Sequence, residues 1–169
     1  MITAKAYTAK KFDQNILFEE LRLGMDETAA EIKKQFNKTT KTWKHKVKFE
    51  KKKDYQPHLL TVVVFTEDEI YGYVHEGTKP HKIRAKNVPR LAFVWGGKGS
   101  YRSATVPRWI GSRGASVSGA LVRPVEVNHP GTEAREFSEV IAEYERYGFK
   151  KRMNNHIKKA VKRSGHEVK

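Results

Sequence analysis

Two short segments that combine histidine, glycine and threonine constrain the fold of this chain more than any other feature. Residues 71–83 read Tyr-Gly-Tyr-Val-His-Glu-Gly-Thr-Lys-Pro-His-Lys-Ile, and residues 127–137 read Val-Asn-His-Pro-Gly-Thr-Glu-Ala-Arg-Glu-Phe. We name them the first corner and the second corner, because each predicts a strand or short helix that meets a sharp turn. Gly77 and Gly131 stand where such a turn needs a positive φ or a close backbone approach, which a residue without Cβ permits.

The residues before the first corner predict two helices and two strands. Asp13 is a candidate N-cap for a helix that stops at Gly24, and Asp26 is a candidate N-cap for a second helix. Apolar positions of this second helix recur every three or four residues: Ala29, Ile32, Phe36, Thr40 and Trp43. Residues 47–50 alternate as in a half-buried strand, residues 51–54 predict a turn, and residues 59–65 predict a strand buried on both faces.

The region around the first corner predicts a helix and a hairpin. Thr66 and Glu69 have the spacing of a capping box, which favours a short helix over residues 67–76, with a strand as the alternative. Residues 82–84 and 91–95 then resemble a small hairpin, and residues 120–127 predict an edge or bulged strand because they contain Pro124.

The C-terminal part predicts a helical pair. A helix should begin near Glu133 and end or kink at Gly148, and a second apolar stripe runs from Phe149 to Val161. The sum is an α+β fold: a small, mostly antiparallel sheet packed by an N-terminal helix and a C-terminal helical pair. We expect a single domain over residues 1–163 with a long inserted loop, followed by a mobile basic tail at 164–169.

The net charge of +15 is concentrated in two segments. Residues 33–53 hold 10 basic and 1 acidic residues, residues 146–169 hold 9 and 1, and residues 54–145 hold 11 of each. Such segregation predicts a polyanionic neighbour, either nucleic acid or an acidic protein surface, with two solvated helix faces as the alternative. The candidate contacts are Lys33, Lys34, Lys38, Lys41, Lys44, Lys150, Lys151, Arg152, Lys158, Lys159 and Lys162.

Composition excludes several classes of protein and site. The chain has no cysteine, which rules out disulfides, thiolate nucleophiles and cysteine-bound zinc, and it has no run of about 18 apolar residues. The first residues lack the apolar stretch of a signal peptide, so we expect folding in a reducing cytoplasm.

Residues 96–119 are rich in glycine, serine, arginine and threonine, and a loop of this length is usually functional or disordered. We expect it to be mobile in the monomer and to be ordered by assembly. The candidate assembly residues are Tyr101, Arg102, Arg108, Trp109 and Arg113. Trp43 and Trp95 could stack on bases, but their positions on a helix stripe and an apolar strand favour the core.

The sequence gives weaker support for catalysis and for metal binding. His75, Glu76, His81 and His129 could meet at a metal, although their spacing matches no specific motif. His75, His129 and Arg135 are candidates for a nuclease, without a recognisable arrangement. There is neither a phosphate-binding loop of the Gly-x-x-x-x-Gly-Lys-Ser/Thr type nor a Gly-x-Ser-x-Gly elbow. We therefore expect no cofactor and no enzymatic activity.

The two corners in this order resemble the head–tail joining (tail-completion, minor tail, neck) proteins of long-tailed double-stranded DNA bacteriophages. The resemblance covers about residues 26–163, and the residues that carry it are Tyr73, Glu76, Gly77, Thr78, His129, Pro130, Gly131, Arg135 and Phe137. It implies that these residues determine the fold, and Glu76 and Arg135 could join the corners by a charge-assisted hydrogen bond.

The resemblance also implies a structural role in the virion. The expected partners are other copies of the chain in a ring, hexameric by analogy, and the neighbouring head-closure or portal and tail-terminator or tail-tube proteins. Double-stranded DNA in the neck lumen is a further candidate partner. The expected location is the head–tail junction, after synthesis in the host cytoplasm.

Overall fold

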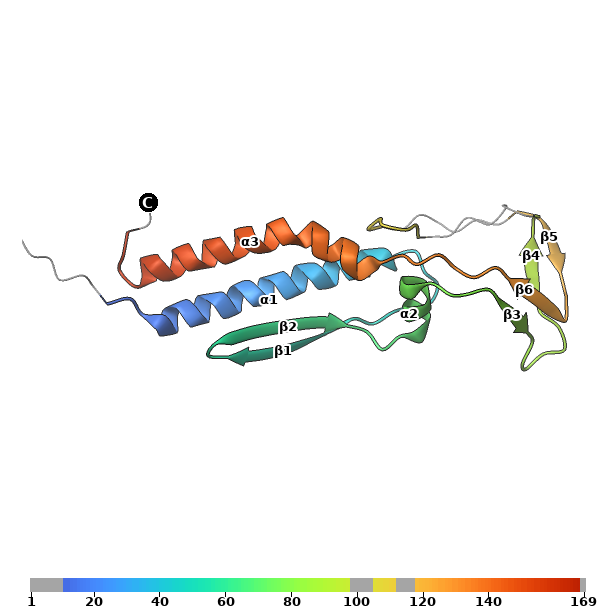
Figure 1. Cartoon of the computed structure of the whole chain (residues 1–169), viewed down its shortest axis with the longest axis horizontal. Helices are drawn as coiled ribbons and strands as arrows, with labels where there is room; N and C mark the ends of the chain where they lie inside the picture. Colours follow the sequence, from blue (N-terminus) through green and yellow to red (C-terminus); the bar gives the residue numbers. More distant parts are fainter. Residues whose placement is uncertain (1–10, 98–104, 112–117, 168–169) are drawn as a thin grey trace, which may run out of the picture. The chain divides into compact units, whose positions relative to one another are not determined.

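The computed structural model describes residues 11–97, 105–111 and 118–167. These residues form three helices and six short strands, which follow one another in the order labelled in Figure 1. They are α1 (Gln14–Thr39), β1 (Glu50–Gln56), β2 (Leu59–Phe65), α2 (Glu69–Glu76), β3 (His81–Arg84), β4 (Phe93–Trp95), β5 (Ala120–Val122), β6 (Glu126–His129) and α3 (Phe137–Arg163). The predicted α+β class is confirmed, but the described strands form three two-stranded sheets instead of one small sheet.

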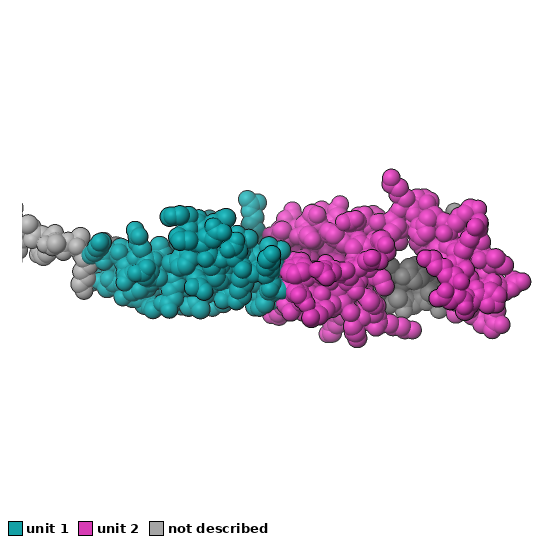
Figure 2. Space-filling view, turned by 90° about the horizontal axis from the view of Figure 1, so that it is seen from below, with its two compact units in different colours: residues 1–31, 51–63, 145–169 teal, residues 32–50, 64–144 magenta. Residues whose placement is uncertain are grey.

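The chain divides into two compact units, coloured separately in Figure 2. Unit 1 comprises residues 1–31, 51–63 and 145–169, and unit 2 comprises residues 32–50 and 64–144. Helices α1 and α3 and the β1–β2 hairpin each contribute residues to both units, and the single domain over 1–163 stays a prediction. Within the described residues, no helix is long and apolar enough to cross a membrane.

Helix α1 is one helix, so the predicted stop at Gly24 and restart at Asp26 are wrong. The helix begins as predicted, because Asp13 Oδ1 accepts a hydrogen bond from Asn15 N at 2.8 Å. Gly24 is retained inside the helix for packing: a Cβ there would lie 2.9 Å from Met153 Sδ and 3.0 Å from the His156 ring of α3. The glycine thus allows Met153 and His156 of α3 to pack closely against α1.

Helix α3 is also continuous, so the predicted break at Gly148 and the helical pair are wrong. A mid-helix glycine costs only about 1 kcal/mol, which the flanking helical residues and packing outweigh. The helix starts at Phe137 rather than near Glu133. At its C-terminus, His166 N donates to Val161 O at 3.1 Å, so the described start of the predicted tail caps the helix.

The β1–β2 hairpin lies where a turn and a fully buried strand were predicted. Residues 51–54 belong to β1, and the strand expected at 47–50 is mostly irregular. Tyr55 OH donates to Asp26 Oδ1 at 2.5 Å and Lys53 Nζ lies 2.6 Å from the same atom, so contacts with α1 hold this lysine-rich strand. In β2, Leu59 and Val63 are exposed, which contradicts burial on both faces.

The remaining strands pair across long separations, so the predicted hairpin of residues 82–84 with 91–95 is wrong. β3 pairs with β6, and β4 pairs with β5, both antiparallel. The expected single strand over 120–127 is broken between β5 and β6, because Pro124 cannot donate to a ladder. Residues 96–119 therefore connect the two strands of the β4–β5 hairpin.

Helix α2 confirms the helical prediction before the first corner, but its cap differs. Asp68 is the N-cap and its Oδ1 accepts from Tyr71 N at 2.8 Å, while Thr66 Oγ1 accepts only from Asp68 N. Asp68 Oδ2 also pairs with His45 Nε2. The His45 contact, aided by the Tyr71 amide, lowers the pKa of Asp68 although burial opposes the shift.

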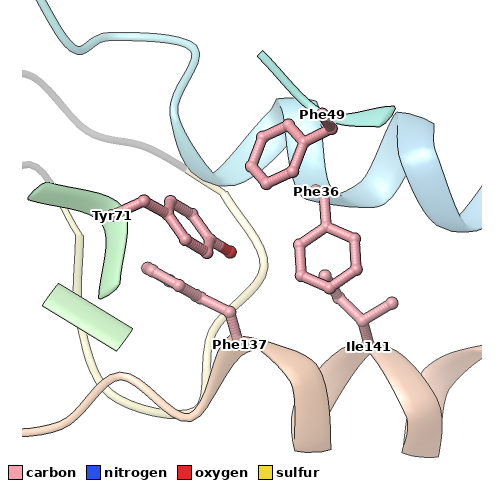
Figure 3. Close-up of a cluster of buried hydrophobic side chains, with 5 residues drawn as sticks. All are labelled: Phe36, Phe49, Tyr71, Phe137 and Ile141. Atoms are coloured by element: carbon pink, nitrogen blue, oxygen red, sulfur yellow. The ribbon is translucent and has the colours of Figure 1, made fainter. Parts of the chain in front are cut away.

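The core of unit 2 is an aromatic cluster drawn in Figure 3. Its buried members are Phe36, Phe49, Tyr71, Phe137 and Ile141. Tyr71 stacks on Phe137 with a centroid separation of 5.3 Å and meets Phe49 edge-on at 5.0 Å. Burial raises the pKa of the Tyr71 hydroxyl. This cluster joins residues of α1, α2 and α3, and two of its members, Tyr71 and Phe137, belong to the two corners.

The tryptophans divide differently from the expectation. Trp43 packs against the aromatic cluster, with its ring 6.0 Å from Tyr71, but it lies beyond the end of α1. Trp95 is 52% exposed, so its assignment to the core is wrong. The two-stranded β4–β5 ladder has too few residues to cover an indole ring.

Candidate functional site

The two corners pair with each other through their backbones. Thr78 N donates to Thr132 O at 2.9 Å, and Thr132 N donates to Thr78 O at 3.0 Å. This reciprocal bridge keeps the register of the β3–β6 ladder and lies three positions beyond the His81–His129 pair. Residues that are 54 positions apart in sequence thus form one junction, which we name the corner junction.

Both corner glycines are required by backbone geometry. Gly77 has φ +78° and Gly131 has φ +89°, which confirms the predicted positive φ. A Cβ on Gly77 would lie 2.5 Å from Thr132 O, and a Cβ on Gly131 would lie 2.2 Å from Thr78 O. A Cβ at either position would therefore clash with a carbonyl oxygen that forms the bridge.

His75 connects the first corner to the N-terminus of α3. Its Nδ1 accepts a hydrogen bond from Phe137 N at 3.0 Å, so that nitrogen carries no proton. Its carbonyl oxygen accepts from Arg135 N at 3.0 Å and from Glu136 N at 3.2 Å. The last residues of α2 thus satisfy backbone donors that the start of α3 would otherwise leave open.

The predicted link between Glu76 and Arg135 is replaced by local contacts. Arg135 is 7% exposed, and its Nη1 donates to Glu133 O at 2.9 Å. Glu76 is exposed and Tyr73 is 58% exposed, so both point away from the junction that their neighbours build. Phe137 is fully buried in the aromatic cluster.

The histidines of the corners make local hydrogen bonds. His129 Nδ1 accepts from Gly131 N at 3.1 Å, and His81 Nδ1 donates to Lys79 O at 2.8 Å. The His81 and His129 rings face each other across the ladder with centroids 5.0 Å apart. Among the described residues, no three His, Asp or Glu side chains are placed to hold one metal ion.

The described middle of the predicted assembly loop, residues 105–111, packs on unit 2. Thr105 is 3% exposed and Ile110 contacts the aromatic cluster. Arg108 has φ +52°, and its guanidinium binds Glu136 at 3.1 Å and Glu143 at 3.0 Å. Thr105 and Ile110 of this stretch therefore pack within unit 2, although we expected the loop to be mobile in the monomer. Trp109 is 42% exposed. The candidates Tyr101, Arg102 and Arg113 lie outside the described residues.

The candidate polyanion contacts of the first basic segment do not form one helical face. Lys41 and Lys44 lie beyond the end of α1, so their placement on a helix face is wrong. Lys33 is half-buried, Lys38 Nζ donates to Gln35 Oε1 at 3.0 Å, and Lys34 is exposed on the helix. The sequence pattern failed here because α1 ends four residues earlier than its apolar stripe suggests.

The basic residues of α3 remain on one continuous helix. Lys150, Lys151, Lys158, Lys159 and Lys162 are exposed. Arg152 differs, because it is half-buried, donates to Thr28 Oγ1 at 3.2 Å and binds Glu145 at 2.6 Å. Of the predicted contacts on α3, the five lysines are the ones available to a partner.

Unit 1 also contains a buried polar network that the sequence did not reveal. His156 is 2% exposed, and its Nδ1 donates to Glu20 Oε2 at 2.8 Å while Nε2 lies 3.3 Å from Glu27 Oε2. Arg163 Nη1 donates to Glu20 Oε1 at 2.7 Å. Hydrogen bonds from His156 and Arg163 lower the pKa of Glu20 although burial opposes the shift. A signal existed: Glu20, Gly24 and Glu27 share one side of α1.

Comparison of the chain with protein-family models, with curated proteins and with solved structures gave no match.

Proposed function

We propose that this protein is a structural subunit of the neck of a long-tailed double-stranded DNA bacteriophage. In this role it completes the tail and joins it to the head as one member of a ring. The observation that carries the proposal is the corner junction, in which Thr78 and Thr132 pair reciprocally. Gly77 and Thr78 of the first corner and Gly131 of the second, which carry part of the resemblance, meet at this junction, and their contact supports a role in the fold.

The chemistry at the junction supports a structural role for its histidines. His75 and His129 each use Nδ1 to accept a backbone hydrogen bond, from Phe137 N and from Gly131 N respectively. A general base needs a lone pair directed at a substrate, and these two are directed at the chain's own amides. The hydrogen bonds of the junction therefore hold α2, β3, β6 and α3 together.

Exposed apolar side chains on the β4–β5 hairpin support assembly into a ring. Val94 and Leu121 form a cross-strand pair and are 42% and 60% exposed, and Trp95 is 52% exposed. An isolated two-stranded ladder is only marginally stable in water, so cover from a neighbouring copy would stabilise it. The other partners in this proposal are the adjoining head-closure or portal and tail-terminator or tail-tube proteins.

The test is electron cryomicroscopy of virions that contain this chain. We expect density that fits the corner junction and its helices in a ring at the head–tail junction. Virions without the chain, or with it only in the capsid shell or tail tip, would refute the proposal. In parallel, Leu121→Glu should reduce ring formation measured by mass photometry, whereas Leu59→Glu, at an equally exposed position of β2, should not.

A second candidate function is that of a stand-alone nucleic-acid-binding protein. The observation that favours it is the row of exposed lysines on α3. The same virion experiment separates the two, because a stand-alone binder would be abundant in infected cells and absent from purified particles.

A further inference from the structure

The free side of α3 in unit 1 carries a stripe of basic and polar residues. At about 100° per residue, the members of the stripe fall within a sector of about 80°: Tyr147, Lys151, Asn155, Lys158 and Lys162. All five are exposed, and Tyr147 is 79% exposed. The buried positions His156 and Ala160 lie on the opposite side of the helix, toward α1. We name this set the α3 stripe.

The charges of the α3 stripe have no acidic partners within the described chain. Lys151, Lys158 and Lys162 make no ion pair there, whereas Arg152 binds Glu145 and Arg163 binds Glu19 and Glu20. The sequence contains no Asp or Glu from residue 146 to residue 163. Arg152 and Arg163 therefore contribute to the fold of unit 1, whereas the lysines of the stripe have no ion-pair partner among the described residues.

A groove of about 300 Å³ runs along one edge of the α3 stripe. Helix α3 lines it with Arg152, Lys158, Lys159 and Lys162 and with the amide of Asn155, and α1 contributes Glu27. Glu27 Oε2 is 3.3 Å from His156 Nε2, so the groove's carboxylate is directed toward an imidazole. The groove is therefore lined mainly by cations and one amide, with a single carboxylate, and its volume is large enough for a phosphate group.

We propose that the α3 stripe and this groove bind the phosphodiester backbone of double-stranded DNA. Lysine, asparagine and tyrosine are among the side chains that contact phosphate and sugar oxygens in protein–DNA complexes. From Tyr147 to Lys162 the stripe covers 16 residues, or about 22 Å of rigid helix, along which a duplex presents phosphates at fixed spacing.

Duplex DNA fits better than the other polyanions. Proteins that bind single-stranded nucleic acids stack the bases on several aromatic side chains, and the stripe contains only Tyr147. Lysine is depleted at protein–protein interfaces, whereas lysine, asparagine and tyrosine all contact the phosphates and sugars of DNA. The identification of the DNA as phage DNA rests on the proposed function, but the binding itself depends only on α3.

The test is fluorescence anisotropy of the full chain with a 30-base-pair duplex of arbitrary sequence at several salt concentrations. Each lost phosphate contact reduces the slope of log K against log salt by about 0.9. We expect the triple variant Lys151→Gln, Lys158→Gln and Lys162→Gln to reduce that slope by about 2–3 and the affinity at least about tenfold.

The matched control is Lys79→Gln, Lys86→Gln and Arg123→Gln, which removes the same charge from exposed positions of unit 2. We expect it to bind within about threefold of the wild type, with its slope lowered by less than about 1. Circular dichroism must show that both variants fold. Equal losses in the two variants, or an unchanged slope in the first, would overturn the proposal.

Two further probes identify the kind of polyanion. Binding of polyglutamate as tight as that of the duplex, lost in the first triple variant, would overturn the proposal in favour of an acidic protein partner. Equally tight binding of inorganic phosphate would overturn it in favour of a small-anion site. If the duplex binds as expected but the virions lack the chain, the neck function fails and the DNA surface stands.

Discussion

His75 in α2 accepts at Nδ1 the backbone hydrogen bond of Phe137 in α3, at 3.0 Å. A side chain 62 residues away thus takes the place of a local N-cap residue. The same two rings stack, with centroids 6.2 Å apart, and Phe137 stacks in turn on Tyr71. His75 therefore caps the N-terminus of α3 by a hydrogen bond and also packs its ring against the aromatic cluster.

Removal of the His75 acceptor should destabilise the protein. In His75→Leu the Phe137 amide loses its partner in a half-buried place, which should lower the free energy of unfolding by about 1–3 kcal/mol. His75→Asn can present an oxygen at a similar position and should lose less. Urea unfolding followed by circular dichroism measures both. The control His81→Leu, at an exposed position, should stay within about 0.5 kcal/mol; an equal loss there would contradict the capping role.

The corner glycines should tolerate no side chain. Gly77→Ala and Gly131→Ala combine a positive φ with a Cβ closer than 3.0 Å to carbonyl oxygens. We expect each to lower the free energy of unfolding by more than about 2 kcal/mol. Gly72→Ala is the control, because a Cβ there has no atom within 4 Å and lies inside α2. It should raise stability by about 0.5–1 kcal/mol in thermal unfolding. Losses of similar size in all three variants would refute the argument.

The sequence predicted those features that local chemistry determines. The positive φ of Gly77 and Gly131, the helix before the first corner and the helix start at Asp13 all follow from residues that interact within a few positions. The α+β class followed from the hydrophobic periods.

The features that failed depend on distant partners. The pairing of β3 with β6, rather than with its neighbour, is decided by the Thr78–Thr132 bridge and by Arg84 binding Glu126, which no local pattern contains. Gly24 inside α1 lies against Met153 and His156 of α3, and no local pattern in the sequence reveals these contacts. The same cause hid the Glu20–His156 network, whose members are 136 positions apart.

The Glu20 network should make stability depend on acid pH. Because the pKa of Glu20 is lowered below 4.5 in the folded state, its contribution is complete above about pH 4.5 and is lost as the pH falls through the lowered pKa. At pH 6, Glu20→Gln should therefore have a lower free energy of unfolding than the wild type. Between pH 5 and pH 3, the free energy of unfolding of the variant should fall less than that of the wild type. Chemical unfolding across that range gives the comparison.

The control for this network is Glu19→Gln. Glu19 binds the same Arg163, at 2.8 Å, but its side chain is 61% exposed. A surface ion pair contributes about 0–1 kcal/mol, so this variant should change stability little at pH 6. If the two variants behave alike, the buried position of Glu20 is not what makes its contribution large.

The segment 105–111 should contribute to the stability of the isolated chain. Ile110 contacts the aromatic cluster and Thr105 is almost fully buried, so this stretch covers part of the core that would otherwise meet water. Ile110→Ala should lower the free energy of unfolding by about 1–2 kcal/mol, less than for a fully buried isoleucine because Ile110 is half-buried. Val88→Ala, at a residue that is 58% exposed, should stay within about 0.5 kcal/mol.

Replacement of residues 98–117 by a short Gly-Ser linker should then lower the melting temperature clearly. An unchanged melting temperature would mean that the contacts of residues 105–111 add nothing to the fold of the monomer.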